Sequence, residues 1–162
     1  MSKDKKELFR EIEARLYSYK DLNIKIKNKE LQIEKKKNDY RGCGAISYDE
    51  RTGVTYNISR SVEKEIIKRE KDIAKLAKEK IDLEIEKQSI ENALTALNSD
   101  ENTLFEYFYN SRNKNTMTCI AIKMHRDRSY CYTIRQNLVY KIMGMLYPNY
   151  DDLPLLNEKT TL

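Results

Sequence analysis

The stretch TCIAIKMHRDRSYCYTIRQNL, residues 118–138, decides how the C-terminal part of this chain folds. It begins with apolar residues at helical spacing, continues through a short polar break at residues 125–127, and ends in a second run at helical spacing. A helix of two turns, a short turn and a longer helix make the helix-turn-helix pattern. The stretch therefore predicts a helix-turn-helix.

Each of the two predicted helices has an apolar face suited to packing inward. These faces consist of Ile120, Ala121 and Met124 in the first helix and of Cys131, Ile134 and Leu138 in the second. The outward face of the second helix offers hydrogen-bond donors, acceptors and an aromatic ring, on Arg128, Ser129, Tyr130, Thr133, Gln136 and Asn137. Side chains of these kinds bind base edges and phosphates in protein–DNA complexes.

Positive charge is concentrated around the same stretch. The whole chain carries a net charge of +5 over 162 residues. Residues 111–145 alone carry seven cations against Asp127, a net charge of +6, so the rest of the chain sums to −1. The seven cations are Arg112, Lys114, Lys123, Arg126, Arg128, Arg135 and Lys141. A positive excess confined to 35 residues predicts salt-dependent binding to double-stranded DNA.

We expect two groups of DNA-binding residues. The first group would reach bases or nearby phosphates and consists of Arg128, Ser129, Tyr130, Thr133 and Gln136. The second group would position the phosphate backbone and consists of Lys114, Lys123, Arg126, Arg135 and Lys141. A three-helix bundle that binds no nucleic acid would show the same spacing, and Tyr130 and Tyr132 would then be packing residues.

Two long amphipathic segments precede this region. The first, residues 4–38, places an apolar stripe on Leu8, Ile12, Tyr19, Leu22, Ile26 and Ile33, interrupted by Arg15 and Lys29. The second, residues 61–97, places a similar stripe on Val62, Ile66, Ile73, Leu76, Leu83, Ile90, Leu94 and Leu97, interrupted by Arg69, Lys80 and Lys87. Two such helices are expected to pair as an antiparallel hairpin or coiled coil, within one chain or between the chains of a homodimer.

The expected fold is all-α, with three parts. Residues 1–97 would form the long hairpin, and its interrupting segment, residues 41–60, holds three of the four glycines and could be a small β-hairpin or an Ω-type loop. Residues 98–146 would form the helix-turn-helix domain, with cap-like starts at Asn98, Thr116 and Asp127. Residues 147–162 would be a tail.

Several classes of protein are excluded at this stage. Three cysteines without a CxxC pair, and a single histidine, predict neither a disulfide framework nor a zinc site, and no cofactor motif is present. No paired acids, P-loop or nucleophile with a base indicate an enzyme. No apolar run reaches the roughly 20 residues of a membrane span, and no signal-peptide core opens the chain. We therefore expect a cytoplasmic protein.

The stretch TMTCIAIKMHRDRSYCYTIRQNLVYKI resembles the helix-turn-helix of sigma factor region 4. Ile120 and Ala121 stand at the Ile-Ala pair of that motif, Met124 stands for its leucine, and residues 127–129 stand for its Ser-Arg-Ser. The whole chain also resembles phage-encoded sigma-like regulators of the ArpU/RinA type. That resemblance implies a regulator that activates late phage genes or related operons and has RNA polymerase as a partner.

The chain departs from the sigma pattern in two ways. His125 replaces the glycine common in the turn, and Thr118 and Cys119 replace the usual acidic residues. No segment resembles the strand-melting region 2, so the chain does not look like a complete sigma factor. Two other functions fit the composition: a structural DNA-handling protein, such as a phage small terminase subunit, and a coiled-coil interaction protein. A closed ring of subunits would favour the terminase.

Overall fold

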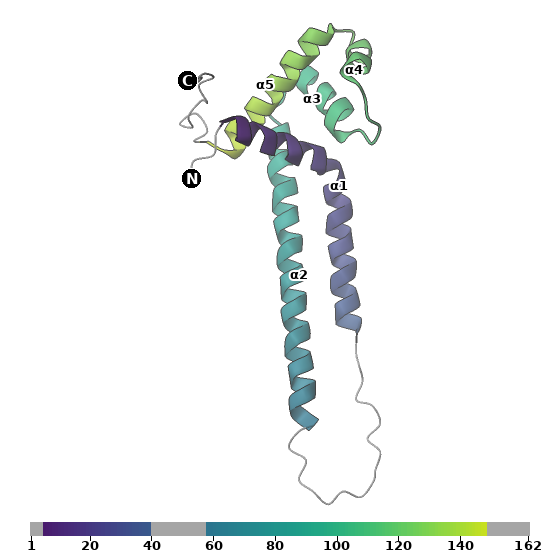
Figure 1. Cartoon of the computed structure of the whole chain (residues 1–162), viewed down its shortest axis with the longest axis vertical. Helices are drawn as coiled ribbons and strands as arrows, with labels where there is room; N and C mark the ends of the chain where they lie inside the picture. Colours follow the sequence, from purple (N-terminus) through teal and green to yellow (C-terminus); the bar gives the residue numbers. More distant parts are fainter. Residues whose placement is uncertain (1–4, 40–57, 149–162) are drawn as a thin grey trace, which may run out of the picture. The chain divides into compact units, whose positions relative to one another are not determined.

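The structure, a computed structural model, describes residues 5–39 and 58–148, and only the backbone of residues 58–62. Within these ranges the chain is helical and has no strand, which confirms the all-α class (Figure 1). In chain order the helices are α1 (Lys5–Asn38), α2 (Ile58–Leu94), α3 (Ser99–Phe105), the π-helix η1 (Glu106–Asn110), α4 (Met117–Met124) and α5 (Arg128–Leu146). Residues 41–57 of the predicted loop, and almost all of the predicted tail, lie outside the described residues.

The chain divides into two compact units. The middle unit comprises residues 23–84, and the terminal unit comprises residues 1–22 and 85–162. The sequence predicted a boundary at residue 97, whereas α1 and α2 each contribute to both units. The first part of α1 belongs with the C-terminal helices because its apolar side chains are buried in their core. None of the described helices is long and apolar enough to cross a membrane.

The middle unit holds segments of α1 and α2 side by side (Figure 1). Ion pairs link the two segments at Lys29–Glu79 (2.7 Å), Lys80–Glu30 (2.8 Å) and Lys36–Asp72 (3.2 Å). Residue numbers rise along α1 as they fall along α2, so the segments run antiparallel. Lys29 and Lys80, which interrupt the two predicted stripes, are therefore bridging residues. Ile66, predicted within a stripe, is instead 42% exposed.

The terminal unit is built around a buried core. The first part of α1 contributes Leu8, Ile12, Leu16 and Leu22, all at most 2% exposed. Leu16 was not in the predicted stripe, whereas Tyr19 was predicted there and is only half-buried. The four-residue steps from Leu8 to Leu16 differ from the heptad rhythm because this part of α1 packs in a globular core rather than along one partner helix.

The end of α2 and the helices after it complete this core. A capping box opens α3: the Asn98 side chain accepts a hydrogen bond from the Glu101 N–H, and the Glu101 side chain accepts one from the Asn98 N–H, both at 2.8 Å. This confirms the cap predicted there. The π-helical turn η1 then shifts the side chains onward along the helix. Within this turn Tyr109 is fully buried, whereas Phe108 is half-buried.

Candidate nucleic-acid interface

Helices α4 and α5 are joined by a tight turn whose ends are capped. The Thr116 side chain accepts a hydrogen bond from a backbone N–H in the first turn of α4, as predicted for its N-cap. His125 ends α4 in the left-handed conformation, with φ 53° and ψ 44°. Glycine is favoured in that conformation, and histidine tolerates it better than most residues do. The turn therefore forms with histidine at the position where glycine is usual. Asp127 is the N-cap of α5, without a side-chain bond to the helix.

The inner faces of α4 and α5 are nearly as predicted. Ile120 and Ala121 are buried on α4, and Met124 at its end is half-buried. On α5, the buried side chains are Cys131, Ile134, Leu138, Val139, Ile142 and Met143. Burial raises the pKa of the Cys131 thiol, so Cys131 is a core residue rather than a reactive thiol. The described residues contain no cluster of potential metal ligands.

The outer face of α5 carries an exposed polar row. Ser129, Thr133 and Gln136 are all exposed and follow one another at steps of four and three residues, the spacing of a single helix face. The Thr133 hydroxyl donates to the Ser129 carbonyl at 3.2 Å. Tyr130 and Asn137, also exposed, border this row. Ser129, Thr133 and Gln136, with Tyr130 beside them, therefore share one accessible surface.

Three of the five cations predicted to position DNA are paired within the protein. Arg126 contacts Asp100 at 3.3 Å, Arg135 contacts Glu13, and Lys141 contacts Glu101 at 2.9 Å. The three acids lie on α1 and α3, outside the segment whose charges were counted from the sequence. The local excess of positive charge is thus partly neutralised by the fold.

Arg135 is the most enclosed of these three cations. Its Nε donates to Glu13 Oε1 at 2.8 Å, and the Tyr109 hydroxyl donates to the same oxygen at 2.9 Å. Its guanidinium also lies over the Phe108 ring, 5.1 Å from the centroid. The exposed fractions of the side chains are 26% for Arg135 and 16% for Glu13. These contacts give Arg135 a structural role that its position in the sequence did not reveal.

Four cations of the segment form no ion pair within the described part of the chain: Arg112, Lys114, Lys123 and Arg128. Arg112 and Lys114 lie in the loop before α4, and both are exposed. Lys123 lies over a tyrosine ring. Arg128 opens α5, and its guanidinium lies over the Tyr132 ring and donates to the Tyr132 hydroxyl at 3.3 Å. Tyr132 is 40% exposed, so it is a surface residue.

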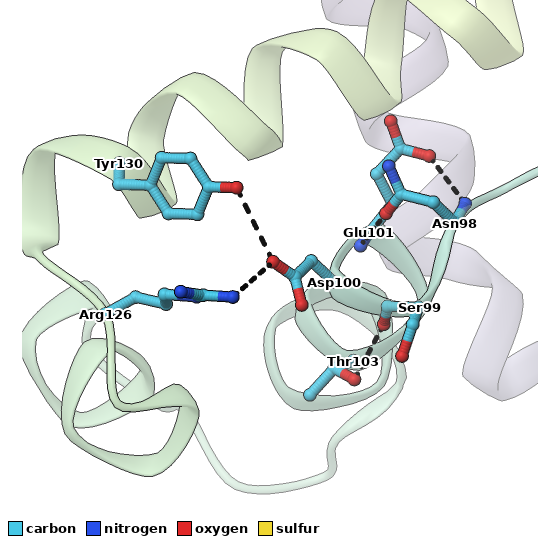
Figure 2. A network of polar contacts seen from close by, with 7 residues as sticks. All are labelled: Asn98, Ser99, Asp100, Glu101, Thr103, Arg126 and Tyr130. Carbon is cyan, nitrogen blue, oxygen red and sulfur yellow. Dashed lines mark hydrogen bonds and ion pairs between the residues drawn. The ribbon is translucent and has the colours of Figure 1, made fainter.

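A small polar cluster lies where the turn meets α3, and Figure 2 shows it from close by. Asp100 Oδ2 accepts from the Arg126 guanidinium at 3.3 Å and from the Tyr130 hydroxyl at 3.5 Å. The Arg126 guanidinium also lies 5.6 Å from the centroid of the Tyr130 ring. Asp100 was not predicted as a site residue, because nothing in the sequence connects it to a turn 26 residues away.

Tyr130 lies at the junction of two open clefts. One cleft lies beside α4 and the turn and is lined by Thr118, Ala121, Ile122, His125, Arg126, Asp127 and Tyr130. The other lies between the start of α3 and α5 and is lined by Asn98, Ser99, Asp100, Glu101, Tyr130, Thr133, Ile134 and Asn137. Both clefts are lined largely by polar and charged side chains next to the exposed row of α5.

Comparison with known proteins returns no relative. No protein-family model, curated protein or solved structure matches the chain. The resemblance to sigma factor region 4 therefore stays a prediction from the residues.

Proposed function

We propose that this protein is a DNA-binding transcriptional regulator in which α4, the turn and α5 act as a helix-turn-helix. In this proposal, α5 lies in the major groove of a promoter and α4 lies above it. The observation that carries the proposal is the exposed row of Ser129, Thr133 and Gln136, directly opposite the buried face of α5. Among the described residues, these three side chains are exposed and lie outside the buried core of the terminal unit.

The chemistry of the row suits base recognition. A glutamine such as Gln136 can bind adenine through two hydrogen bonds, and hydroxyls such as those of Ser129 and Thr133 can bind either donors or acceptors. Arg128 is an exposed cation at the start of α5, where it can bind guanine or a phosphate. A cation at a helix start opposes the helix dipole, so a neighbouring phosphate would offset that cost.

Phosphate binding would be the task of the cations that form no ion pair within the described residues. Arg112 and Lys114 lie just before the N-terminus of α4, where helix N–H groups also favour an anion. Lys123 is exposed near the other end of the same helix. With Arg128, these residues offer up to four phosphate contacts. The logarithm of affinity would then fall with the logarithm of salt concentration with a slope of roughly −3 to −4.

The middle unit would act as a partner-binding part of the regulator. Its segments of α1 and α2 are suited to an antiparallel helical hairpin of the coiled-coil type, with several isoleucine and leucine side chains left exposed. This surface would pair with a second copy or with RNA polymerase. The resemblance to sigma-like regulators favours a phage or prophage late-gene activator, working beside or in place of a sigma factor.

The test is enrichment of duplexes from a random DNA pool by the full-length protein, at about 50 and about 200 mM salt. A regulator should enrich a defined motif that survives at the higher salt. Binding without a motif would contradict sequence-specific regulation and favour a structural DNA-handling protein. Absence of binding at both concentrations would remove the DNA proposal and favour an interaction protein.

One substitution separates base contacts from phosphate contacts. Replacing Arg128 with alanine should weaken binding to the enriched motif by about 1–3 kcal/mol and relax the preference at one base pair, if Arg128 binds a base. The matched control is Lys123→Ala, which removes a cation from α4 and should weaken binding to all duplexes alike. If both variants weaken every duplex equally, Arg128 is a phosphate contact.

A further inference from the structure

Tyr130 differs from Ser129 and Thr133 because its hydroxyl has a partner on another helix, whereas the Thr133 hydroxyl bonds the Ser129 carbonyl within α5. The side chain is 45% exposed and lies beside the polar row of α5. Its hydroxyl points toward Asp100 at the start of α3, as Figure 2 shows. Asp100 thus determines whether the Tyr130 hydroxyl can donate a hydrogen bond to DNA or only accept one.

The direction of the hydrogen bond follows from the chemistry of the two groups. An ionised carboxylate has only acceptor oxygens, whereas a phenol has one proton to donate. The single proton of Tyr130 is therefore directed to Asp100, and only the lone pairs of its oxygen face outward. Arg126 differs, because a guanidinium has five N–H groups and uses one of them on Asp100. Arg126 can still bind a phosphate, and its charge offsets the repulsion between Asp100 and DNA.

The start of α3 is held in place, so Asp100 does not depend on its own contacts for its position. The reciprocal hydrogen bonds between Asn98 and Glu101 fix the first turn of α3. Lys141 of α5 binds the carboxylate of Glu101 at 2.9 Å and ties this turn to the helix that carries Tyr130. The distance between Asp100 and α5 is thereby set by neighbouring residues.

We infer that Asp100 is a positioning residue for Tyr130. Because the Tyr130 hydroxyl donates its proton to Asp100, its oxygen can only accept a hydrogen bond from DNA, and the donor would be an amino group of a base. This inference rests on the proposed function. In the major groove, the amino groups are N6 of adenine and N4 of cytosine. A phosphate carries no proton, so an acceptor cannot bind it. Tyr130 is thereby assigned to specificity for adenine or cytosine at one base position.

The test measures base preferences with enriched duplexes, using full-length wild-type protein and variants. Wild-type protein should prefer adenine or cytosine at one position by roughly fivefold, the size expected for one hydrogen bond. Tyr130→Phe should abolish that preference and leave the other positions unchanged. Asp100→Asn should abolish the same preference, because an amide both donates and accepts and no longer commits the tyrosine proton. In the Tyr130→Phe background, Asp100→Asn should have no further effect on it.

Two matched controls separate this effect from general changes. Tyr140→Phe removes a hydroxyl from another exposed tyrosine of α5, and Glu106→Gln removes a carboxylate that accepts a hydrogen bond from Asn110 of its own helical turn. Neither should change the preference at the Tyr130 position. Thermal unfolding followed by circular dichroism should show that Asp100→Asn is folded.

The possible failures are distinguishable. If Asp100→Asn strengthens binding to all duplexes equally and keeps the base preference, Asp100 merely repels or competes with phosphates and the inference is wrong. The same holds if Tyr130→Phe keeps the preference. If the wild-type protein enriches no motif, the proposed function fails first, and the inference falls with it.

Discussion

The terminal and middle units keep their helices together in different ways. Every described apolar side chain that is fully buried, from Leu8 to Met143, lies in the terminal unit. In the described part of the middle unit no side chain is fully buried, and exposed apolar residues such as Leu31 (62%) accompany ion pairs between its two helical segments. Burial stabilises far more than exposed ion pairs do. The terminal unit should therefore contribute most of the free energy of unfolding, while some apolar side chains of the middle unit stay exposed.

The largest expected effect comes from breaking the core of the terminal unit. Leu138 is fully buried, so Leu138→Ala should lower the free energy of unfolding by about 2–5 kcal/mol through lost burial and a cavity. Leu31→Ala, the matched change in the middle unit, should have little effect. Urea unfolding followed by circular dichroism measures both. Equal losses would contradict the proposed division of stability.

The next effect concerns the network around Arg135. Glu13→Ala leaves the Arg135 guanidinium and the Tyr109 hydroxyl without their shared acceptor. We expect Glu13→Ala to lower the free energy of unfolding by about 1–3 kcal/mol. This is less than breaking a fully buried ion pair costs, because water reaches the Arg135 side chain. A double-mutant cycle with Arg135→Ala should give a coupling energy in this range. If the two losses simply add, the contact contributes nothing to stability.

Tyr109 makes the stability of the same unit sensitive to alkaline pH. Burial, and then the charge of Glu13, raise its pKa above the ordinary value of 10.0, although Arg135 opposes them. Since the raised pKa favours the protonated phenol in the folded state, this contribution is complete below about pH 10 and is lost as pH rises above it. Wild-type protein should lose about 1 kcal/mol more than Tyr109→Phe between pH 10 and 11, measured by urea unfolding at each pH. Parallel curves for the two proteins would refute this.

The smallest effect belongs to the middle unit. Lys36 and Asp72 form an ion pair with both side chains more than 40% exposed. Lys36→Ala should therefore cost at most about 1 kcal/mol, and the difference from wild type should disappear at about 1 M salt. Thermal unfolding at low and high salt provides the measurement. A larger loss of stability that persists at high salt would mean that ion pairs are the main contribution to the stability of the middle unit.

Local features of the fold could be predicted from the sequence, and long-range pairings could not. The caps at Asn98 and Thr116 follow from residues three positions apart, and the apolar faces of α4 and α5 follow from helical periodicity. The partner of Arg135 lies 122 residues away, on a helix whose charges look like ordinary surface residues. The same holds for Asp100, whose contacts with the turn depend on how α3 packs against α5.

The π-helical turn η1 is a second feature that could not be predicted from the sequence. The segment Glu106–Asn110 forms a π-helical turn, which the α-helical periodicity of the sequence did not predict. No residue in the segment, which contains neither glycine nor proline, predicts that change. The outward positions of the polar row could be predicted from the sequence, because α5 is a regular α-helix from Arg128 to Leu146.

We propose that the outer row of α5 contacts DNA and that the middle unit does not. The most direct test follows backbone amide signals by nuclear magnetic resonance while the enriched duplex is added to the full-length protein. We predict shifts concentrated at Ser129, Thr133 and Gln136, with the signal of Leu31 unchanged. Shifts confined to the middle unit, or no shifts at all, would contradict the claim.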